Sequence, residues 1–194
     1  MNNVRILSLC DYSGRWPEPY RDAGHEVIQV DLKHGSDVRL FEHIKGEIHG
    51  VMCAPPCTEF AGSGARWWAG KEPHLLTDGL ALVDACLRAV AIYNPDWWVL
   101  ENPVGRLKRW LGPHTFTFNP NEYAGWLPDG EQEGEQYTKR TCLWGRFTSP
   151  EKKELPAIHG SMMWAKYGGK SERTKEARSL TPRGFARAFY KANL

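Results

Sequence analysis

A cysteine that follows two prolines is the residue in this chain with the clearest chemical potential. Cys57 comes directly after Pro55 and Pro56, and the apolar run Val51–Cys53 precedes them. The run predicts a buried strand that the prolines end, so Cys57 stands where the chain leaves the sheet. A thiol on a loop at the mouth of a parallel sheet is placed to act as a nucleophile. The alternative role, a small residue of the core, does not explain the Pro-Pro-Cys sequence.

A second apolar run ends in an acidic side chain. Trp97–Leu100 is followed by Glu101, Asn102 and Pro103, which places a carboxyl group at the end of another predicted strand. Burial beside tryptophans disfavours the charged form of a carboxyl group, so we expect the pKa of Glu101 to be raised. A carboxylic acid that keeps its proton near neutral pH is suited to general acid catalysis.

These two motifs together resemble the cytosine-5 DNA methyltransferase family, in which a Pro-Cys loop precedes a Glu-Asn-Val strand. Pro103 stands at the third position of that strand here. Other segments resemble the family in the same order along the chain. They are the first cofactor strand and turn at Ile6–Gly14, the acidic end of the second strand at Asp31, the third cofactor segment at Asp37 and Val38, a partly kept Gln-x-Arg-x-Arg at Gln136–Arg140, and Arg-x-Leu-Thr-x-Arg at Arg178–Arg183.

The resemblance implies methyl transfer to carbon 5 of cytosine in DNA. Cys57 would attack carbon 6 of the base, Glu101 would hold or donate a proton at ring nitrogen 3, and Arg140 would contact the base or the adjacent phosphate. Because a free thiol titrates near ~8.5, fast attack requires a lowered pKa or a nearby positive charge. A duplex covers both reacting carbons, so the base must be flipped out or supplied in a single strand.

The resemblance also implies S-adenosylmethionine as the methyl donor. Gly14 would let the backbone approach the methionine part, Asp31 would accept hydrogen bonds from the ribose hydroxyls, and Asp37 would receive the adenine amino group. The full set of expected cofactor residues is Asp11, Tyr12, Ser13, Gly14, Asp31, Asp37, Val38 and Pro55.

Other substrates and roles stay open at this point. The stretch between Arg140 and Arg178 is too short for the family's usual target-recognition domain, which predicts a small, phage-type or bacterial-type member with weak sequence preference. The same covalent chemistry on RNA, on a free cytidine nucleotide or with a modified donor is one alternative. A nucleic-acid-binding protein without catalysis is another, although the presence of both Cys57 and Glu101 argues against it.

Two segments are candidates for contact with DNA. The Gly62–Trp68 stretch carries Arg66 and two tryptophans and follows the nucleophile. Between Lys166 and Lys191 basic residues far outnumber acidic ones, which is typical of a surface that binds phosphates. From these segments we select Arg66, Lys170, Arg173 and Lys175 as the residues that contact nucleic acid.

Composition favours a reduced, globular protein. The chain has 194 residues, 41 % hydrophobic content, nine tryptophans and a net charge of only +2. Five cysteines without a secretory pattern predict free thiols in the cytoplasm, and no apolar stretch has the length of a membrane span. Cys53 and Cys57 have C-x₃-C spacing, but no second pair completes a zinc site, so we expect no metal.

The predicted elements alternate between strands and helices. We expect strands at Val4–Leu9, Val27–Asp31, Ile48–Cys53, Trp97–Leu100 and Thr141–Gly145, a short helix at Pro17–Ala23, and a longer one at Thr77–Tyr93 capped by Thr77 and Asp78. Asp129–Glu135 is predicted to be an exposed loop. This order predicts an α/β fold with a doubly wound, mostly parallel sheet, as in Rossmann-like methyltransferases. We expect a catalytic and cofactor-binding domain over residues 1–147 and a short basic segment over residues 148–194 packed on it.

Overall fold

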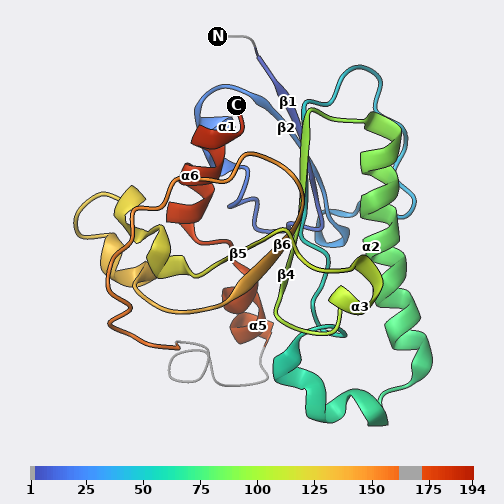
Figure 1. The fold of residues 1–194 in the computed structure, drawn as a ribbon. Helices are drawn as coiled ribbons and strands as arrows, with labels where there is room; N and C mark the ends of the chain where they lie inside the picture. Colours follow the sequence, from blue (N-terminus) through green and yellow to red (C-terminus); the bar gives the residue numbers. More distant parts are fainter. Residues whose placement is uncertain (1–2, 162–171) are drawn as a thin grey trace.

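The structure is a computed structural model that describes residues 3–161 and 172–194 (Figure 1). At its centre lies a six-stranded sheet in the order β2-β1-β3-β4-β6-β5. The strands are β1 (Arg5–Leu9), β2 (Glu26–Val30), β3 (Gly50–Cys53), β4 (Trp97–Pro103), β5 (Phe116–Phe118) and β6 (Thr141–Arg146).

The strands are mostly parallel. β1 pairs in parallel with β2 and β3, and β3 pairs in parallel with β4. β6 runs antiparallel to β4 on one side and to β5 on the other, so β5 points the same way as the first four strands. Helix α2 covers one face of the sheet, while α1 and α6 lie on the other (Figure 1). The predicted α/β, doubly wound, mostly parallel sheet is confirmed.

The longest helix begins earlier than the sequence predicted. α2 runs from Pro73 to Tyr93, so the expected cap at Thr77 and Asp78 is wrong. Proline is tolerated at the start of a helix because its missing N–H would have no partner there, and Thr77 instead lies inside the first turns. The helix ends at Asn94, whose left-handed φ of 42° fits the predicted break before Pro95.

The other helices are α1 (Glu18–Asp22), α3 (Lys108–Leu111), α5 (Glu172–Ser179), α6 (Arg183–Ala192) and the 3₁₀ helices η1 (Leu32–His34), η2 (Gly62–Gly70), η3 (Pro120–Glu122), η4 (Ala124–Trp126) and η5 (Gln132–Glu135).

Side-chain alternation along the strands divides the core into two layers. Leu7, Leu9 and Val51 belong to the layer that also contains residues of α2. Ile6 and Met52, their neighbours along the same strands, belong to the other layer. Most buried side chains of both layers are apolar, and the buried Ser8 of β1 donates to Asp11. The candidate reactive groups lie toward the strand ends.

Helix α6 is part of the second core layer. Phe185 and Phe189 are buried and lie against Trp16, at ring-centroid distances of 6.1 and 5.6 Å. Phe185 also stacks on Phe118 of β5 at 3.7 Å. Residues on both sides of the predicted boundary at 147/148 therefore share one hydrophobic cluster.

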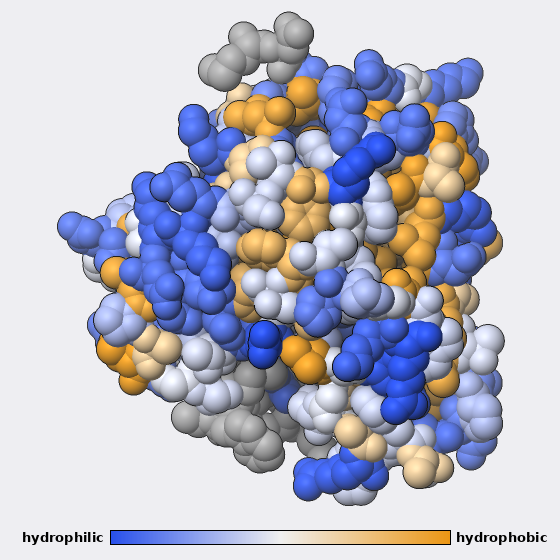
Figure 2. Space-filling view, in the orientation of Figure 1, coloured by the Kyte–Doolittle hydropathy of each residue, from blue (hydrophilic) through white to orange (hydrophobic). Residues whose placement is uncertain are grey.

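The surface view in Figure 2 mixes hydrophilic and apolar side chains, and its lower end is mainly pale and blue. Within the described residues, no helix combines the length and the apolar character needed to cross a membrane.

Candidate active site

The nucleophile candidate lies on a tight turn at the carboxyl edge of the sheet. β3 ends at Cys53, and the carbonyl of Cys57 accepts hydrogen bonds from the amides of Phe60 and Ala61, both at 2.9 Å. Asn102 of β4 holds the approach to this turn, since its Nδ2 donates to the carbonyl of Pro55 at 2.9 Å. Cys57 itself is exposed, so the thiol is accessible to a substrate.

Glu101 lies on the neighbouring strand. β4 pairs with β3 so that Leu100 is opposite Cys53, which brings the carboxyl end of β4 beside the Cys57 turn. Burial raises the pKa of the Glu101 carboxyl, and the negative charge of Asp11 acts in the same direction. The positive charge of Lys139 opposes them. The predicted rise in the pKa of Glu101 through burial is confirmed.

Nearby charges also act on the pKa of the Cys57 thiol. Desolvation of the thiol group by burial raises the pKa of Cys57, and the negative charge of Glu101 raises it further. Lys139 and Arg178 lower it without reversing the direction. The nearby positive charges that thiolate formation requires are therefore present, but the thiol is predominantly protonated at neutral pH in the free protein.

The cation that acts on both reactive groups is Lys139. Its Nζ donates to the carbonyl of Arg178 at 2.5 Å, which ties it to the segment before α6. Arg140, the residue expected here, is exposed and has its electrostatic influence on Cys142. Since adjacent residues point to opposite sides of an extended chain, only one of the two faces Glu101. Lys139 is thus the cation that acts on both reactive groups, and contact of Arg140 with the base or the adjacent phosphate stays a prediction.

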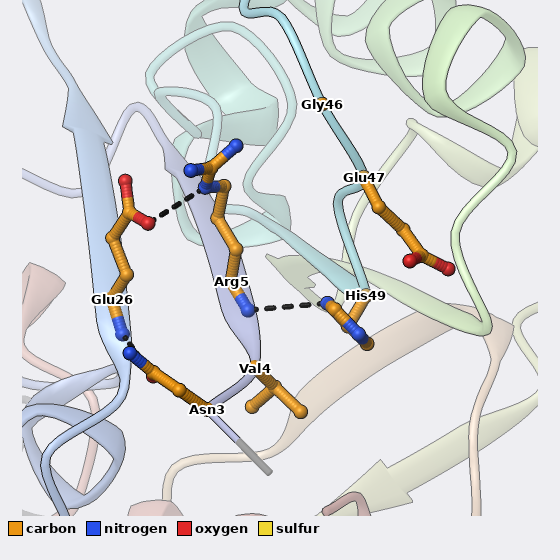
Figure 3. Close-up of a pocket in the computed structure, with 7 residues that line it drawn as sticks. All are labelled: Asn3, Val4, Arg5, Glu26, Gly46, Glu47 and His49. Atoms are coloured by element: carbon orange, nitrogen blue, oxygen red, sulfur yellow. Dashed lines mark hydrogen bonds and ion pairs between the residues drawn. The ribbon is translucent and has the colours of Figure 1, made fainter.

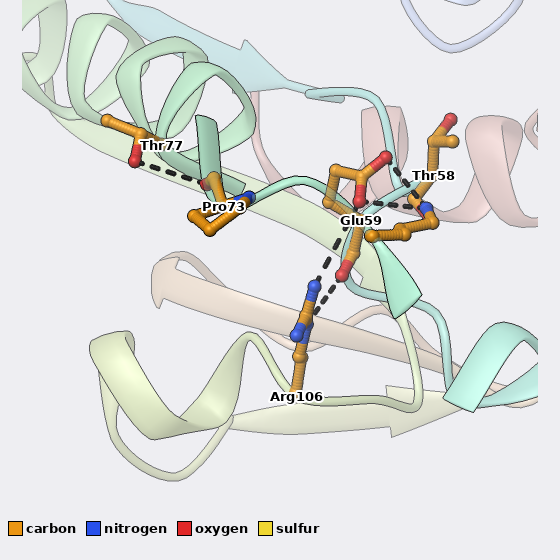
Figure 4. A network of polar contacts seen from close by, with 6 residues as sticks. Thr58, Glu59, Pro73, Thr77 and Arg106 are labelled. Carbon is orange, nitrogen blue, oxygen red and sulfur yellow. Dashed lines mark hydrogen bonds and ion pairs between the residues drawn. The ribbon is translucent and has the colours of Figure 1, made fainter. Parts of the chain in front are cut away.

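A network of polar contacts around Glu59 supports the Cys57 turn (Figure 4). Lys71 Nζ lies 2.8 Å from Glu59 Oε2, and Arg106 Nε donates to the Glu59 carbonyl at 2.6 Å. The Arg106 amide also donates to the carbonyl of Phe60 at 2.8 Å, directly beside Gly105. A side chain at Gly105 would overlap the carbonyl oxygen of Phe60, so glycine is required for this close approach. No sequence pattern pointed to Arg106, because this residue acts through the backbone of a distant turn.

The expected cofactor turn is organised by its own acid. Asp11 is buried and its Oδ1 accepts from the Ser13 hydroxyl at 2.7 Å and from the Gly14 amide at 3.0 Å. Gly14 has a left-handed φ of 60°, and a side chain there would meet Arg21 and Gln29. The glycine is thus required by the turn itself, whereas its approach to a cofactor stays a prediction.

Asp31 and Tyr12 lie at neighbouring strand ends. Asp31 follows β2 and caps η1, where its Oδ1 accepts from the Lys33 amide at 2.8 Å. Tyr12 is exposed, with its ring 5.0 Å from that of His34 and the Lys33 ammonium 4.6 Å above it. A carboxylate can accept hydrogen bonds from ribose hydroxyls, and an exposed aromatic ring beside it can stack on a base.

In the third expected cofactor segment, the acid Asp37 already has a partner within the protein. Arg39 forms an ion pair with Asp37 at 2.6 Å, and these contacts hold the pKa of the Asp37 carboxyl below its ordinary value. Val38 is buried in the core, so its side chain does not face a ligand site. Pro55 is also buried, and its carbonyl is occupied by Asn102. The role of Val38 in a cofactor site stays a prediction, and any contact there would have to come from its backbone.

The expected nucleic-acid residues divide into two groups. Arg66 is exposed on η2, and its guanidinium lies 5.0 Å from the centre of the Trp67 ring. Arg173 and Lys175 belong to α5, of which only the backbone is described at these positions. Lys170 lies outside the described residues.

A pocket at the opposite, amino edge of the sheet differs from this site (Figure 3). There Arg5 forms an ion pair with Glu26 at 2.8 Å, and its amide donates to His49 Nδ1 at 3.2 Å. Arg5 and Glu26 of this pocket are thus paired with each other, whereas the carboxyl edge holds the Cys57 thiol next to the half-buried Glu101 carboxyl.

The sequence is similar to that of a viral protein. Over 161 residues the chain is 29 % identical to the "Probable DNA (cytosine-5)-methyltransferase" of frog virus 3 (isolate Goorha), a match that covers 73 % of this chain and 70 % of the viral protein. The resemblance to cytosine-5 DNA methyltransferases is confirmed. No model of a protein family matches the chain.

The fold is also shared with a solved methyltransferase structure. A protein assigned as a DNA modification methyltransferase, encoded within an E. coli prophage, superposes with a TM-score of 0.52 at 14 % sequence identity. The match covers 79 % of this chain and 52 % of the prophage protein, so the chain spans about half the length of that structure. The Rossmann-like methyltransferase fold predicted from the order of strands and helices is confirmed.

Proposed function

We propose that this protein transfers a methyl group to carbon 5 of cytosine in DNA. The observation that carries the proposal is the exposed Cys57 thiol beside Glu101, a carboxyl whose pKa is raised by burial. The likeness to the frog virus 3 protein supports DNA as the substrate.

Cys57 acts as the nucleophile. Its thiolate attacks carbon 6 of the cytosine ring, which makes carbon 5 electron-rich enough to accept a methyl group. Ionised Glu101 opposes formation of the thiolate, because its charge raises the pKa of Cys57. When Glu101 is protonated that opposition disappears, and the charges of Lys139 and Arg178 then favour the thiolate.

Glu101 supplies the matching proton. Attack at carbon 6 places negative charge on the ring, and a proton from Glu101 at ring nitrogen 3 neutralises it. Once carbon 5 carries the methyl group, its proton is lost to water, the electrons of that C–H bond re-form the ring double bond, and the bond to Cys57 breaks to release the thiolate. One carboxyl group thus serves both steps, since its protonated form eases thiolate formation and neutralises the attacked base.

S-adenosylmethionine supplies the methyl group when it is bound. Asp31 has a carboxylate oxygen beyond the one that caps η1, and this oxygen suits the ribose hydroxyls. Tyr12 offers an exposed ring beside it, and the Asp11–Gly14 turn is preorganised next to both. Asp37 fits less well because Arg39 occupies its carboxylate, so an adenine contact there requires that ion pair to open.

Replacement of the nucleophile tests the proposal. Cys57→Ser should reduce 5-methylcytosine formation to background while the cofactor still binds, because a serine hydroxyl is far too weakly ionised to attack carbon 6. Mass spectrometry of nucleosides from treated DNA measures the product. Cys53→Ala is the matched control: this cysteine is buried in β3 and its loss should affect stability and not transfer. Turnover of Cys57→Ser within tenfold of wild type would remove Cys57 from the reaction.

A further inference from the structure

An exposed group of aromatic and basic side chains lies beside the nucleophile turn. Three large apolar residues are well exposed here: Trp67 at 58 %, Val104 at 51 % and Trp110 at 43 %. Arg66 precedes the first of them, and Lys108 and Arg109 precede the last; all three cations are exposed. We call these six residues the aromatic platform.

The platform is joined to the Cys57 turn by backbone contacts. Ala61 forms a β-bridge with Gly105, and the Gly62 amide donates to the carbonyl of Val104 at 2.8 Å. The ring of Trp110 lies 6.3 Å from that of Phe60 in an edge-to-face arrangement. η2 and α3 accordingly lie near each other at the end of the sheet shown low in Figure 1. A molecule bound at Cys57 would meet these residues next.

The exposure of Trp67 is not a general property of this segment. Its neighbour Trp68 is covered, with the Arg106 guanidinium 4.6 Å from the centre of its ring. Trp67 points outward and carries Arg66 on its ring at 5.0 Å. Large exposed aromatic side chains grouped with cations are characteristic of surfaces that bind ligands.

The charge of the platform suits a polyanion. The acid at its base, Glu59, is already paired with Lys71 at 2.8 Å and lies 4.0 Å from Arg106. It therefore does not offset the three exposed cations. Positive side chains interleaved with aromatic rings are the arrangement that binds a nucleotide strand, since phosphates pair with the cations while bases stack on the rings.

We propose that the aromatic platform binds a single strand of DNA next to the target base, with unpaired bases stacked on Trp67 and Trp110. Stacking on a protein ring requires a base with a free face, and in a duplex the neighbouring base pairs cover both faces. The platform therefore favours unpaired over paired DNA. DNA as the partner rests on the proposed function; the stacking itself rests on the exposed rings and cations.

Binding of oligo(dT) without cofactor tests the platform separately from the chemistry, because this strand contains no cytosine. Fluorescence anisotropy should give tighter binding to the single strand than to a duplex of equal length. Trp67→Ala and Trp110→Ala should each weaken single-strand binding by about fivefold to a hundredfold, the usual loss for one stacked base. Ile92→Ala, an equally exposed apolar residue near the end of α2, is the matched control and should change affinity by less than about twofold.

The cations are tested by salt. Each phosphate neutralised on a single strand contributes about −0.7 to the slope of log affinity against log salt, so Arg66→Gln combined with Lys108→Gln and Arg109→Gln should flatten that slope. Wild-type affinity for oligo(dT) in the Trp67→Ala, Trp110→Ala double variant would overturn the proposal, as would a stronger preference for duplex. If the Cys57→Ser experiment refutes the transfer chemistry, the oligo(dT) measurement still tests the platform independently. If transfer is real and the tryptophan variants change nothing, the platform alone is wrong.

Discussion

Two carboxyl groups, the half-buried Glu101 and the buried Glu135, have the same chemistry and opposite surroundings. Burial raises the pKa of both. Glu135 accepts hydrogen bonds from the Arg183 amide at 2.5 Å and from the Gly184 amide at 2.9 Å. In the described part of the chain, the Glu101 carboxyl has no hydrogen-bond partner, and its main stabilising influence is the charge of Lys139.

The difference separates a structural acid from a reactive one. Glu135 satisfies backbone N–H groups at the start of α6, a helix whose own cap residue, Pro182, provides no side-chain hydrogen bond. Its oxygens are occupied and have no capacity left for a substrate. Glu101 is half-buried and its pKa is raised, which suits it to hold a transferable proton.

The largest expected effect is on transfer by Glu101→Gln. The amide has nearly the same shape but cannot give a proton, so the rate should fall by about 10²–10⁴ while the fold is kept. Methyl incorporation into DNA measures it, and Glu135→Gln is the comparison that should retain activity wherever it remains folded. Equal losses in the two variants would break the distinction between the two acids.

Stability as a function of pH gives the same comparison an independent measure. Because the pKa of Glu101 is raised, the folded state holds this proton more tightly than the unfolded chain does. Its contribution is fully present below the ordinary pKa of glutamate and is lost as pH rises through the folded value. In Glu101→Gln that loss should vanish, so thermal unfolding followed from acid to neutral pH should show a flatter decline. An unchanged profile would mean that the carboxyl is not buried in solution.

A smaller effect is expected on the stability of Glu135→Gln. The amide cannot accept from both N–H groups, and one buried donor is left unsatisfied at a cost of about 1–3 kcal/mol. Denaturant unfolding measures the change in the free energy of unfolding. Glu131→Gln is the control, since its ion pair with Arg183 at 2.6 Å is exposed and should contribute about 0–1 kcal/mol. If the control loses as much as Glu135→Gln, α6 is not capped in the way described.

The smallest expected effect is on the reactivity of Cys57 toward iodoacetamide. Lys139→Gln removes a charge that lowers the pKa of Cys57, so alkylation near neutral pH should slow modestly. Glu101→Gln should have the opposite effect, because the charge it removes raises that pKa. Arg140→Gln should change the rate least. Peptide mass spectrometry assigns the labelled cysteine. A greater slowing in Arg140→Gln than in Lys139→Gln would instead identify Arg140 as the cation that lowers the pKa of Cys57.

Local sequence was sufficient for the main elements and for the two reactive groups. Apolar runs predict where β3 and β4 lie, although β4 continues through Glu101 to Pro103, and parallel strands bring their carboxyl ends to one edge. Proline chemistry also explains the one misplaced helix start, since Pro73 can begin a helix as well as Thr77 can cap one. These are short-range effects, and the residues that produce them are neighbours in the chain.

Tertiary structure alone decided which partners those groups have. Lys139 rather than Arg140 acts on Glu101 because the direction of each side chain depends on how the segment before β6 crosses the sheet. Glu135 was expected on an exposed loop, yet it is buried and caps a helix 48 residues away. Such pairings depend on which surfaces pack together, and residue type and spacing do not determine that.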